Sequence, residues 1–352
     1  MKDKYTRQLD GQLKDIFHLE SRGNVNAAVN AINAYVTSNA DDVDGHLMQS
    51  YIMSRTFHHS AALTAFANAV AAAGGPKALK KALDVEIVLI FSNCHGKILR
   101  SSLINVPEIA ERFLFLGLFN ISPKAFDQSI ADIADMVIFQ SMSWNDGTQT
   151  VFYDRFRSDV NFITFPAATM LFFWPYYLQA PAKTDENGRP VYRYAYGDRF
   201  IDSRVRQKKT AEKIVREYTH IDLPITVNLE KVMEVERHKE FGKEANTDVK
   251  IRQFIEDNYK YTPVFYTPNH PTREVMNIQA VQLAQLLGVS VDLAQLPIDE
   301  YPETSSVHHP IHPSIVQYLG LTYRTPNDTF YLSRAGNITF EQFIPLYIEG
   351  KV

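Results

Sequence analysis

The chain contains very little cysteine: Cys94 stands alone among 352 residues. A single cysteine excludes an internal disulfide framework and is typical of a protein kept in a reducing compartment. The first residues, MKDKYTRQLDGQ, also lack the apolar core that follows the charges of a secretory signal. We therefore expect a cytoplasmic protein.

An excess of positive charge is missing as well. Lysine and arginine number 36 against 40 acidic residues, and the formal net charge is −4, so general binding to nucleic acid is not indicated. No GxxxxGK[ST] phosphate loop occurs, which argues against ordinary nucleotide hydrolysis. The most apolar run, VNFITFPAATMLFFWPYYLQA at 160–180, is interrupted by Pro166 and Pro175. We expect a buried strand and turn there and no membrane span.

Residues 1–83 are rich in Ala, Asn and Leu, and we expect them to form a separate helical segment. GNVNAAVNAINAYV, from Gly23, lies 34 residues before FHHSAALTAFANAV, from Phe57. This spacing resembles a tetratricopeptide repeat pair, and helical hairpins of no particular family fit almost as well. Such hairpins leave an apolar face uncovered, so they should pack on the following domain or on a protein partner.

Residues 84–352 are expected to form an α/β domain with a parallel-sheet core and flanking helices. Apolar, β-branched runs that alternate with a helical pattern predict parallel strands joined by helical crossovers. The expected strands are VEIVLIF (85–91), RFLFLGLF (112–119), DMVIFQSMS (135–143) and DVNFITF (159–165), with a helix PKAFDQSIADIA at 123–134. Later helices are expected at 202–218, 228–241, 246–258, 271–287 and 312–319.

The turn SNCHG, directly after the first strand, is the main candidate site. Ligands of open α/β sheets bind at the carboxyl ends of the strands, where a helix N-terminus lowers a cysteine pKa. There Cys94 would be a reactive thiolate and His95 a proton acceptor, while Gly96 would let a ligand approach the backbone. Lys97 and Arg100 add positive charge to the same turn. The alternative is that Cys94 is simply a small buried residue of the turn.

Several motifs resemble the WcbI family of capsular polysaccharide biosynthesis enzymes. They are SNCHG, FQSMS, ITFPAATMLFFWPYY, FYTPNHPTREV and HHPIHPSIVQYLGL, and together they span roughly residues 85–325. The resemblance implies coenzyme A or acetyl-coenzyme A as a substrate, and transfer of an acetyl group.

By position in these motifs, the resemblance implies that Asn93, Cys94 and His95 lie close to the reactive end of coenzyme A. Gln140 and Ser141 match the second motif, while His270 matches the later NHPT motif and becomes a candidate acid or base. The family often has Gln where this chain has His95, so the identity of the base stays open.

Other features have two interpretations each. The segment 198–216 carries seven cations, and Arg204, Arg206 and Lys208 could hold coenzyme A phosphates or belong to an ion-paired surface with Glu212 and Glu217. The aromatic run at 172–177 could line an acyl or sugar pocket or pack in the core. His308, His309 and His312 could suggest zinc, but the Pro residues beside them indicate a helix start, and we expect no metal.

The sequence thus predicts an acyltransferase that uses coenzyme A to modify a sugar or polysaccharide hydroxyl. Cys94 would form an acyl-enzyme, or a histidine would deprotonate the acceptor while Asn93 and backbone N–H groups hold the oxyanion. One alternative is a hydrolase similar to the SGNH esterases with Cys94 as nucleophile. Another is a non-catalytic helical-repeat adaptor that binds a protein through residues 1–83.

Overall fold

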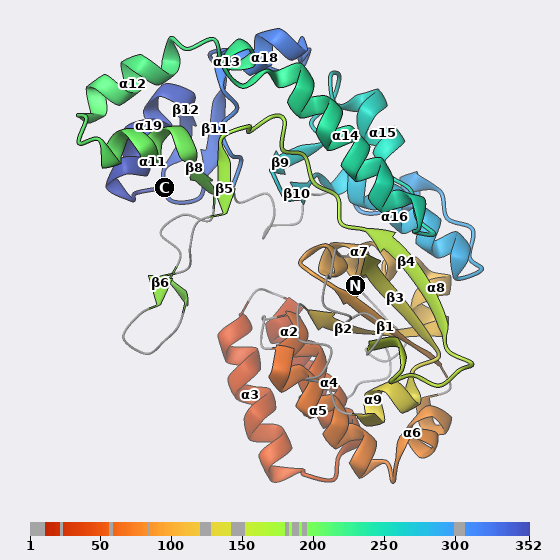
Figure 1. Cartoon of the computed structure of the whole chain (residues 1–352). Coiled ribbons are helices and arrows are strands. Elements are labelled where there is room, and N and C mark those ends of the chain that lie inside the picture. The colour runs from red at the N-terminus through yellow and green to blue at the C-terminus, as the bar shows by residue number, and fades with distance from the viewer. Residues whose placement is uncertain are drawn as a thin grey trace. The chain divides into compact units, whose positions relative to one another are not determined.

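In the computed structural model, the chain forms two compact units (Figure 1). Unit 1 comprises Met1–Ala167, Thr247–Lys250 and Met276–Pro297, and unit 2 comprises Ala168–Asn246, Ile251–Val275 and Ile298–Val352. The structure describes residues 11–21, 24–55, 59–83, 85–119, 128–141, 152–179, 183–184, 190–191, 196–298 and 307–352.

The N-terminal part of unit 1 is helical, as predicted. Its helices are α2 (Gly11–Ser21), α3 (Val25–Ser38), α4 (Val43–Arg55), α5 (His59–Ala72) and α6 (Pro76–Leu83). Helices α3 and α5 begin 34 residues apart, and the matching positions Ala28 and Ala62, and Ile32 and Phe66, are all buried. The repeated spacing therefore places equivalent apolar residues on an inner face, while a tetratricopeptide assignment stays a prediction.

A parallel sheet follows, and it confirms the α/β class and all four predicted strands. These are β1 (Glu86–Ser92), β2 (Phe113–Phe119), β3 (Met136–Ser141) and β4 (Asn161–Pro166), in the order β2-β1-β3-β4. The first crossover contains α7 (His95–Leu103) and α8 (Pro107–Arg112), and the second contains α9 (Gln128–Ile133). The register pairs Phe91 with Phe139, so the carboxyl ends of β1 and β3 are neighbours.

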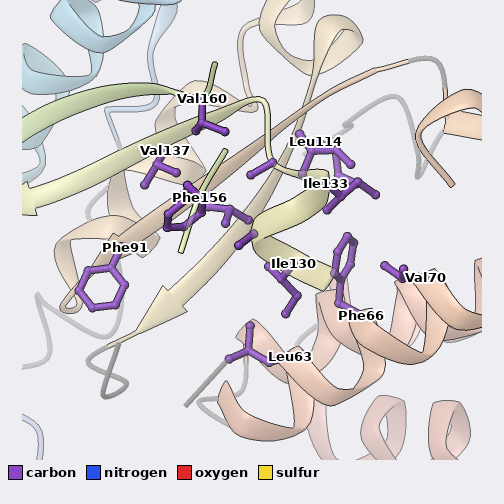
Figure 2. Close-up of a cluster of buried hydrophobic side chains, with 14 of the residues drawn as sticks. Leu63, Phe66, Val70, Phe91, Leu114, Ile130, Ile133, Val137, Phe156 and Val160 are labelled. Atoms are coloured by element: carbon purple, nitrogen blue, oxygen red, sulfur yellow. The ribbon is translucent and has the colours of Figure 1, made fainter. Parts of the chain in front are cut away.

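One face of the sheet shares its core with the N-terminal helices. Leu63, Phe66 and Val70 of α5 form a single buried cluster with sheet residues such as Phe91 and with Ile130 of α9 (Figure 2). Burial of each such side chain contributes about 1.5–3 kcal/mol. This confirms that the helices pack on the following domain, and it explains why the compact units do not follow the expected boundary after residue 83.

Unit 2 combines helices with short antiparallel strand pairs. Its helices are α11 (Arg199–Arg206), α12 (Ala211–Thr219), α13 (Leu223–Val227), α14 (Leu229–Ala245), α15 (Arg252–Asn258), α18 (Pro313–Leu319) and α19 (Phe340–Glu349). Helix α16 (Arg273–Leu286) begins in unit 2 and continues into unit 1, and η1 (Leu293–Gln295) follows it there. The strand pairs are β5 (Tyr177–Gln179) with β8 (Tyr196–Asp198), β6 (Lys183–Thr184) with β7 (Pro190–Val191), β9 (Phe265–Thr267) with β10 (His270–Pro271), and β11 (Thr329–Leu332) with β12 (Gly336–Thr339).

The prediction of one continuous helix at 202–218 is wrong, because two helices occupy this segment. Helix α11 ends before Lys208, which has a left-handed φ of 58°. Thr210 then caps α12 by accepting a hydrogen bond from the Lys213 N–H group. A capping threonine after a left-handed residue starts a new helix, so the basic residues do not share one helix face.

The apolar run at 160–180 forms β4 and a series of turns, as predicted. Phe172, Phe173 and Trp174 are almost fully buried, so core packing is the correct interpretation for these three, while Tyr176 and Tyr177 are half-buried. Among the residues that the structure describes, no helix is both long and apolar enough to cross a membrane.

A buried carboxylate fixes the backbone of these turns. Glu236 of α14 accepts hydrogen bonds from the N–H groups of Leu171 and Phe172, both at 2.7 Å. Burial raises the pKa of Glu236 to about 7, although these two donors and nearby Arg252 lower it. Glu236 lies on the buried face of α14, where its helical spacing from Leu229 and Met233 places it.

The raised pKa predicts a pH-dependent stability. Because folded Glu236 binds its proton more tightly than the unfolded chain, its contribution is largest below about pH 4.5 and is lost as the pH rises to about 7. Glu236→Gln should remove this fall and should lower stability by about 1–3 kcal/mol, since one amide oxygen replaces two carboxylate oxygens. Urea unfolding at pH 5 and pH 7.5 would measure both effects.

The matched control is Glu234→Gln on the exposed side of the same helix. It should keep the fall in stability between the two pH values. Equal pH dependence in the wild type and Glu236→Gln would contradict the assignment.

Candidate functional site

The turn after β1 is pinned by an amide from β3. The Asn93 N–H group donates to Gln140 Oε1 at 2.8 Å, and Asn93 Oδ1 accepts from the His95 N–H group at 2.9 Å. Gln140 is fully buried next to the end of β1, where the β1–β3 register places it. The structure therefore brings together Asn93, His95 and Gln140, and Ser141 follows at the half-buried end of β3.

Hydrogen-bond direction defines the state of His95. A backbone N–H group can only donate, so the Gln140 oxygen must face Asn93 and its Nε2 amide must face His95. That amide lies 3.1 Å from His95 Nδ1, which therefore accepts the bond. His95 is also buried, so Nδ1 is not placed to take a proton from Cys94, contrary to one expectation from the sequence.

Cys94 itself is not an activated thiol. We expected the helix end to lower its pKa, but burial raises the pKa of Cys94 to about 11. Backbone N–H groups and the Lys97 charge act in the opposite direction and do not offset this desolvation. Cys94 is only partly exposed, and burial of its thiol away from water favours the neutral form.

Gly96 allows close packing of α7 on β1. A Cβ atom on Gly96 would lie 1.9 Å from Ser92 Oγ and 2.9 Å from Ile90 Cγ2, both on β1. The missing side chain thus allows α7 to lie close against the strand. This contact explains the glycine by packing, and its predicted role in ligand approach stays a prediction.

Two predicted phosphate-binding cations of α7 are buried. Lys97 acts electrostatically on Cys94. Arg100 donates from Nε to the Phe115 carbonyl at 3.3 Å, and its guanidinium lies 5.0 Å from the centre of the Tyr51 ring. Since β2 is an edge strand in the described sheet, Arg100 joins that edge to α4, which weighs against a phosphate contact.

The basic segment of unit 2 is partly ion-paired. Glu217 binds Arg204 at 3.2 Å and Lys209 at 2.7 Å, and the Arg204 guanidinium stacks on Phe200. This supports the surface interpretation for Arg204. Arg206 and Lys208 are exposed, so they keep the predicted role of binding phosphate.

His270 occupies a half-buried position in unit 2. Its Nδ1 lies 2.9 Å from the Tyr196 hydroxyl, and its N–H group donates to Thr267 Oγ1 at 3.2 Å. The neighbouring Asn269 donates to the Tyr177 hydroxyl at 3.2 Å. Sequence reasoning missed Tyr196, because nothing local distinguishes it. It also did not single out Asn269, although this residue begins the NHPT motif.

The helix after His270 begins at Arg273, slightly later than expected. Cys94 belongs to unit 1 and His270 to unit 2.

The three later histidines have structural roles. His308 stacks on Tyr266, burial lowers the pKa of His309 to about 3, and His312 accepts from the Ser314 N–H group at the start of α18. The predicted helix start is therefore confirmed. Within the described residues, no group of three metal-ligating side chains occurs.

The sequence matches the model of a known protein family. The family model described as "Polysaccharide biosynthesis enzyme WcbI" matches residues 87–292, more than half of the sequence. The chain belongs to the WcbI family. No curated protein matches.

A solved WcbI structure confirms the fold. It is described as a novel polysaccharide biosynthesis enzyme, in a native form without a disulfide bond between coenzyme A and one of its cysteines. The TM-score is 0.60 with 16% identity, over 76% of this chain and 89% of that chain. At this identity the similarity shows the fold alone.

The WcbI match confirms the resemblance seen in the motifs and makes this protein a polysaccharide biosynthesis enzyme. It includes Cys94, Gln140 and His270, whereas residues 1–86 lie outside the matched WcbI range. The helical N-terminal segment is thus not explained by the family match.

Close packing at Gly96 predicts a specific sensitivity. Gly96→Ala should destabilise the protein by about 1–3 kcal/mol, because the new methyl group collides with β1. Gly242→Ala in α14 is the control: nothing lies within 4 Å of the added Cβ, so it should stabilise by about 0.5–1 kcal/mol. Denaturant unfolding measures both, and Ser92→Ala should recover part of the Gly96→Ala loss. Wild-type stability of Gly96→Ala would refute the packing role.

Burial of Cys94 predicts its titration. The midpoint of the pH profile for iodoacetamide labelling should lie near pH 11 in the folded protein and lower in urea, because desolvation disfavours the thiolate. Lys97→Met should move the folded midpoint further up. As Cys94 is the only cysteine, mass spectrometry follows it directly. A folded midpoint below the unfolded one would show an activated thiol instead.

Proposed function

We propose that this enzyme uses an acyl-coenzyme A, with acetyl as the simplest group, to acylate a hydroxyl of a sugar or polysaccharide. The observation that carries the proposal is the Asn93–Cys94–His95 turn at the carboxyl end of β1, held by Gln140. Strand ends of this kind are where open α/β sheets bind ligands. The similar WcbI structure is described with coenzyme A and a cysteine, which supports the same ligand here.

The state of Cys94 favours direct transfer over an acyl-enzyme. The acceptor oxygen would attack the thioester carbon, the carbon–sulfur bond would break, and the hydroxyl proton would pass to a base and then to the coenzyme A thiolate. A neutral Cys94 thiol would have to lose its own proton before it could attack. We therefore propose that Cys94 lies beside the reactive end of coenzyme A without forming an acyl-enzyme, and that His270 is the base.

Asn93 is the proposed oxyanion donor. Its Oδ1 is already held by the His95 N–H group, which leaves the side-chain amide as the donating end. A donor fixed by a hydrogen bond at its other end costs little reorganisation during the reaction. Gln140 would then act on Asn93 through the backbone N–H group.

Coenzyme A binding tests the proposal. Calorimetry should give micromolar affinity, equivalent to about −8 kcal/mol. Cys94→Ser should keep binding and a large part of acyl transfer to a sugar acceptor, whereas His270→Ala should lose about 10²–10⁴-fold in rate. Absence of heat and of competition at millimolar coenzyme A would reject the ligand, and hydrolysis of simple esters without transfer would favour the esterase alternative.

The exposed cation Arg206 provides a second test of coenzyme A binding. Arg206→Ala should weaken coenzyme A but not pantetheine, which lacks the nucleotide phosphates. Arg334→Ala, at an exposed arginine between β11 and β12, should affect neither ligand. Equal losses for both ligands in Arg206→Ala would mean that this residue acts through folding.

A further inference from the structure

A groove in unit 2 is lined by residues that have no place in the proposed acyl transfer. It lies between α12 and α19, two helices that pack on each other (Figure 1), and its volume is about 630 Å³. Sites for small molecules typically have volumes of about 300–1,000 Å³. The groove is therefore large enough for a ligand, and its chemistry indicates which class of ligand it fits.

Helix α12 supplies a fixed carboxylate and a cation to one wall. Hydrogen bonds from its own backbone N–H group and from the Thr210 hydroxyl lower the pKa of Glu212, so this side chain is an ionised acceptor. Arg216 lies one turn further along the same wall. Within the described ranges of the chain, the Arg216 guanidinium has no ion-pair partner, and its N–H groups can only donate.

The backbone defines the protonation of His220, which lines the groove at the end of α12. His220 Nδ1 lies 2.9 Å from the Arg216 carbonyl oxygen. A carbonyl oxygen can only accept, so Nδ1 carries the proton and Nε2 of the neutral ring is an acceptor. The Thr219 hydroxyl, 3.1 Å from Nδ1, donates to the Val215 carbonyl at 2.9 Å and is consistent with this assignment.

Helix α19 adds an acceptor, a donor and an apolar surface to the other wall. Gln342 Oε1 accepts from the Thr339 N–H group at 2.9 Å, which leaves the Gln342 amide as the donating end. Glu341 contributes an exposed carboxylate. Pro345 lies inside the helix and has no N–H group, so it cannot pair with the Glu341 carbonyl. Its ring and Val215 of α12 form the apolar part of the groove.

The polar groups of the groove fit hydroxyl groups better than an anion. The acceptors are Glu212, Glu341 and His220 Nε2, and the donors are Arg216 and the Gln342 amide. A phosphate could use only the donors and would be repelled by both carboxylates, whereas a sugar hydroxyl donates and accepts. We propose that the groove is a binding subsite for neutral sugar units of the polysaccharide on which the enzyme acts.

The choice of a saccharide over a peptide follows from the family, whose members are described as polysaccharide biosynthesis enzymes. The identity of the occupant thus rests on the sugar acceptor of the proposed function, whereas the chemistry of the groove does not. A subsite that holds other units of the same chain would raise the local concentration of the reacting hydroxyl.

An array of immobilised short oligosaccharides tests the proposal without any need for acyl transfer. Neutral sugars should bind the wild type more strongly than uronate-containing sugars of the same length, because uronates meet two carboxylates. Arg216→Met should weaken binding of neutral sugars about tenfold, since it removes charged donors and keeps an unbranched side chain. Glu341→Gln should raise the binding of uronates relative to neutral sugars, because one negative charge is lost.

Arg334→Met and Glu230→Gln are the matched controls at exposed positions outside the groove, and neither should change sugar binding. Coenzyme A binding by Arg216→Met should equal that of the wild type. The inference would be overturned if no neutral sugar bound, if Arg216→Met bound sugars normally, or if uncharged peptides on the same array bound instead. Sugar binding in a protein without acyl transfer would leave the subsite standing and reject the proposed function.

Discussion

The pairing of β1 with β3 is the constraint on which the first-unit site depends. It places Gln140 beside the end of β1. There the Gln140 side chain accepts a hydrogen bond from the Asn93 N–H group and donates one to His95 Nδ1. Because a backbone N–H group fixes the orientation of the amide, it also fixes which nitrogen of His95 accepts. A register shift of one residue would turn Gln140 to the other face of the sheet and leave the turn without this support.

Desolvation sets the protonation states more strongly than the nearby charges do. It keeps Cys94 neutral despite Lys97, and it raises the Glu236 pKa despite two donated backbone bonds. Asp198 behaves in the same way: burial raises its pKa to about 6, although Tyr218 donates a hydrogen bond to it. A helix end and a neighbouring cation alone would lower the pKa of Cys94, but the cost of burial is larger and reverses the direction.

The sequence was informative where a pattern is local. Apolar runs predicted the four strands, and the recurring positions around Ala28 and Ala62 predicted buried helix faces. It did not reveal that Gly96 packs against a strand side chain or that Arg100 donates a hydrogen bond to the edge strand β2. Both depend on which surfaces meet, and spacing along the chain does not contain that information.

The sequence by itself determined the class of fold, the positions of the four strands along the chain and the motifs that resemble the WcbI family. The WcbI family model matches residues 87–292. Only the tertiary structure decided that Gln140 supports the Asn93 turn, that Cys94 is a neutral thiol, and that Tyr196 meets His270. The reason is physical: hydrogen-bond partners and burial arise between segments distant in the chain, and they exist only once the chain has folded.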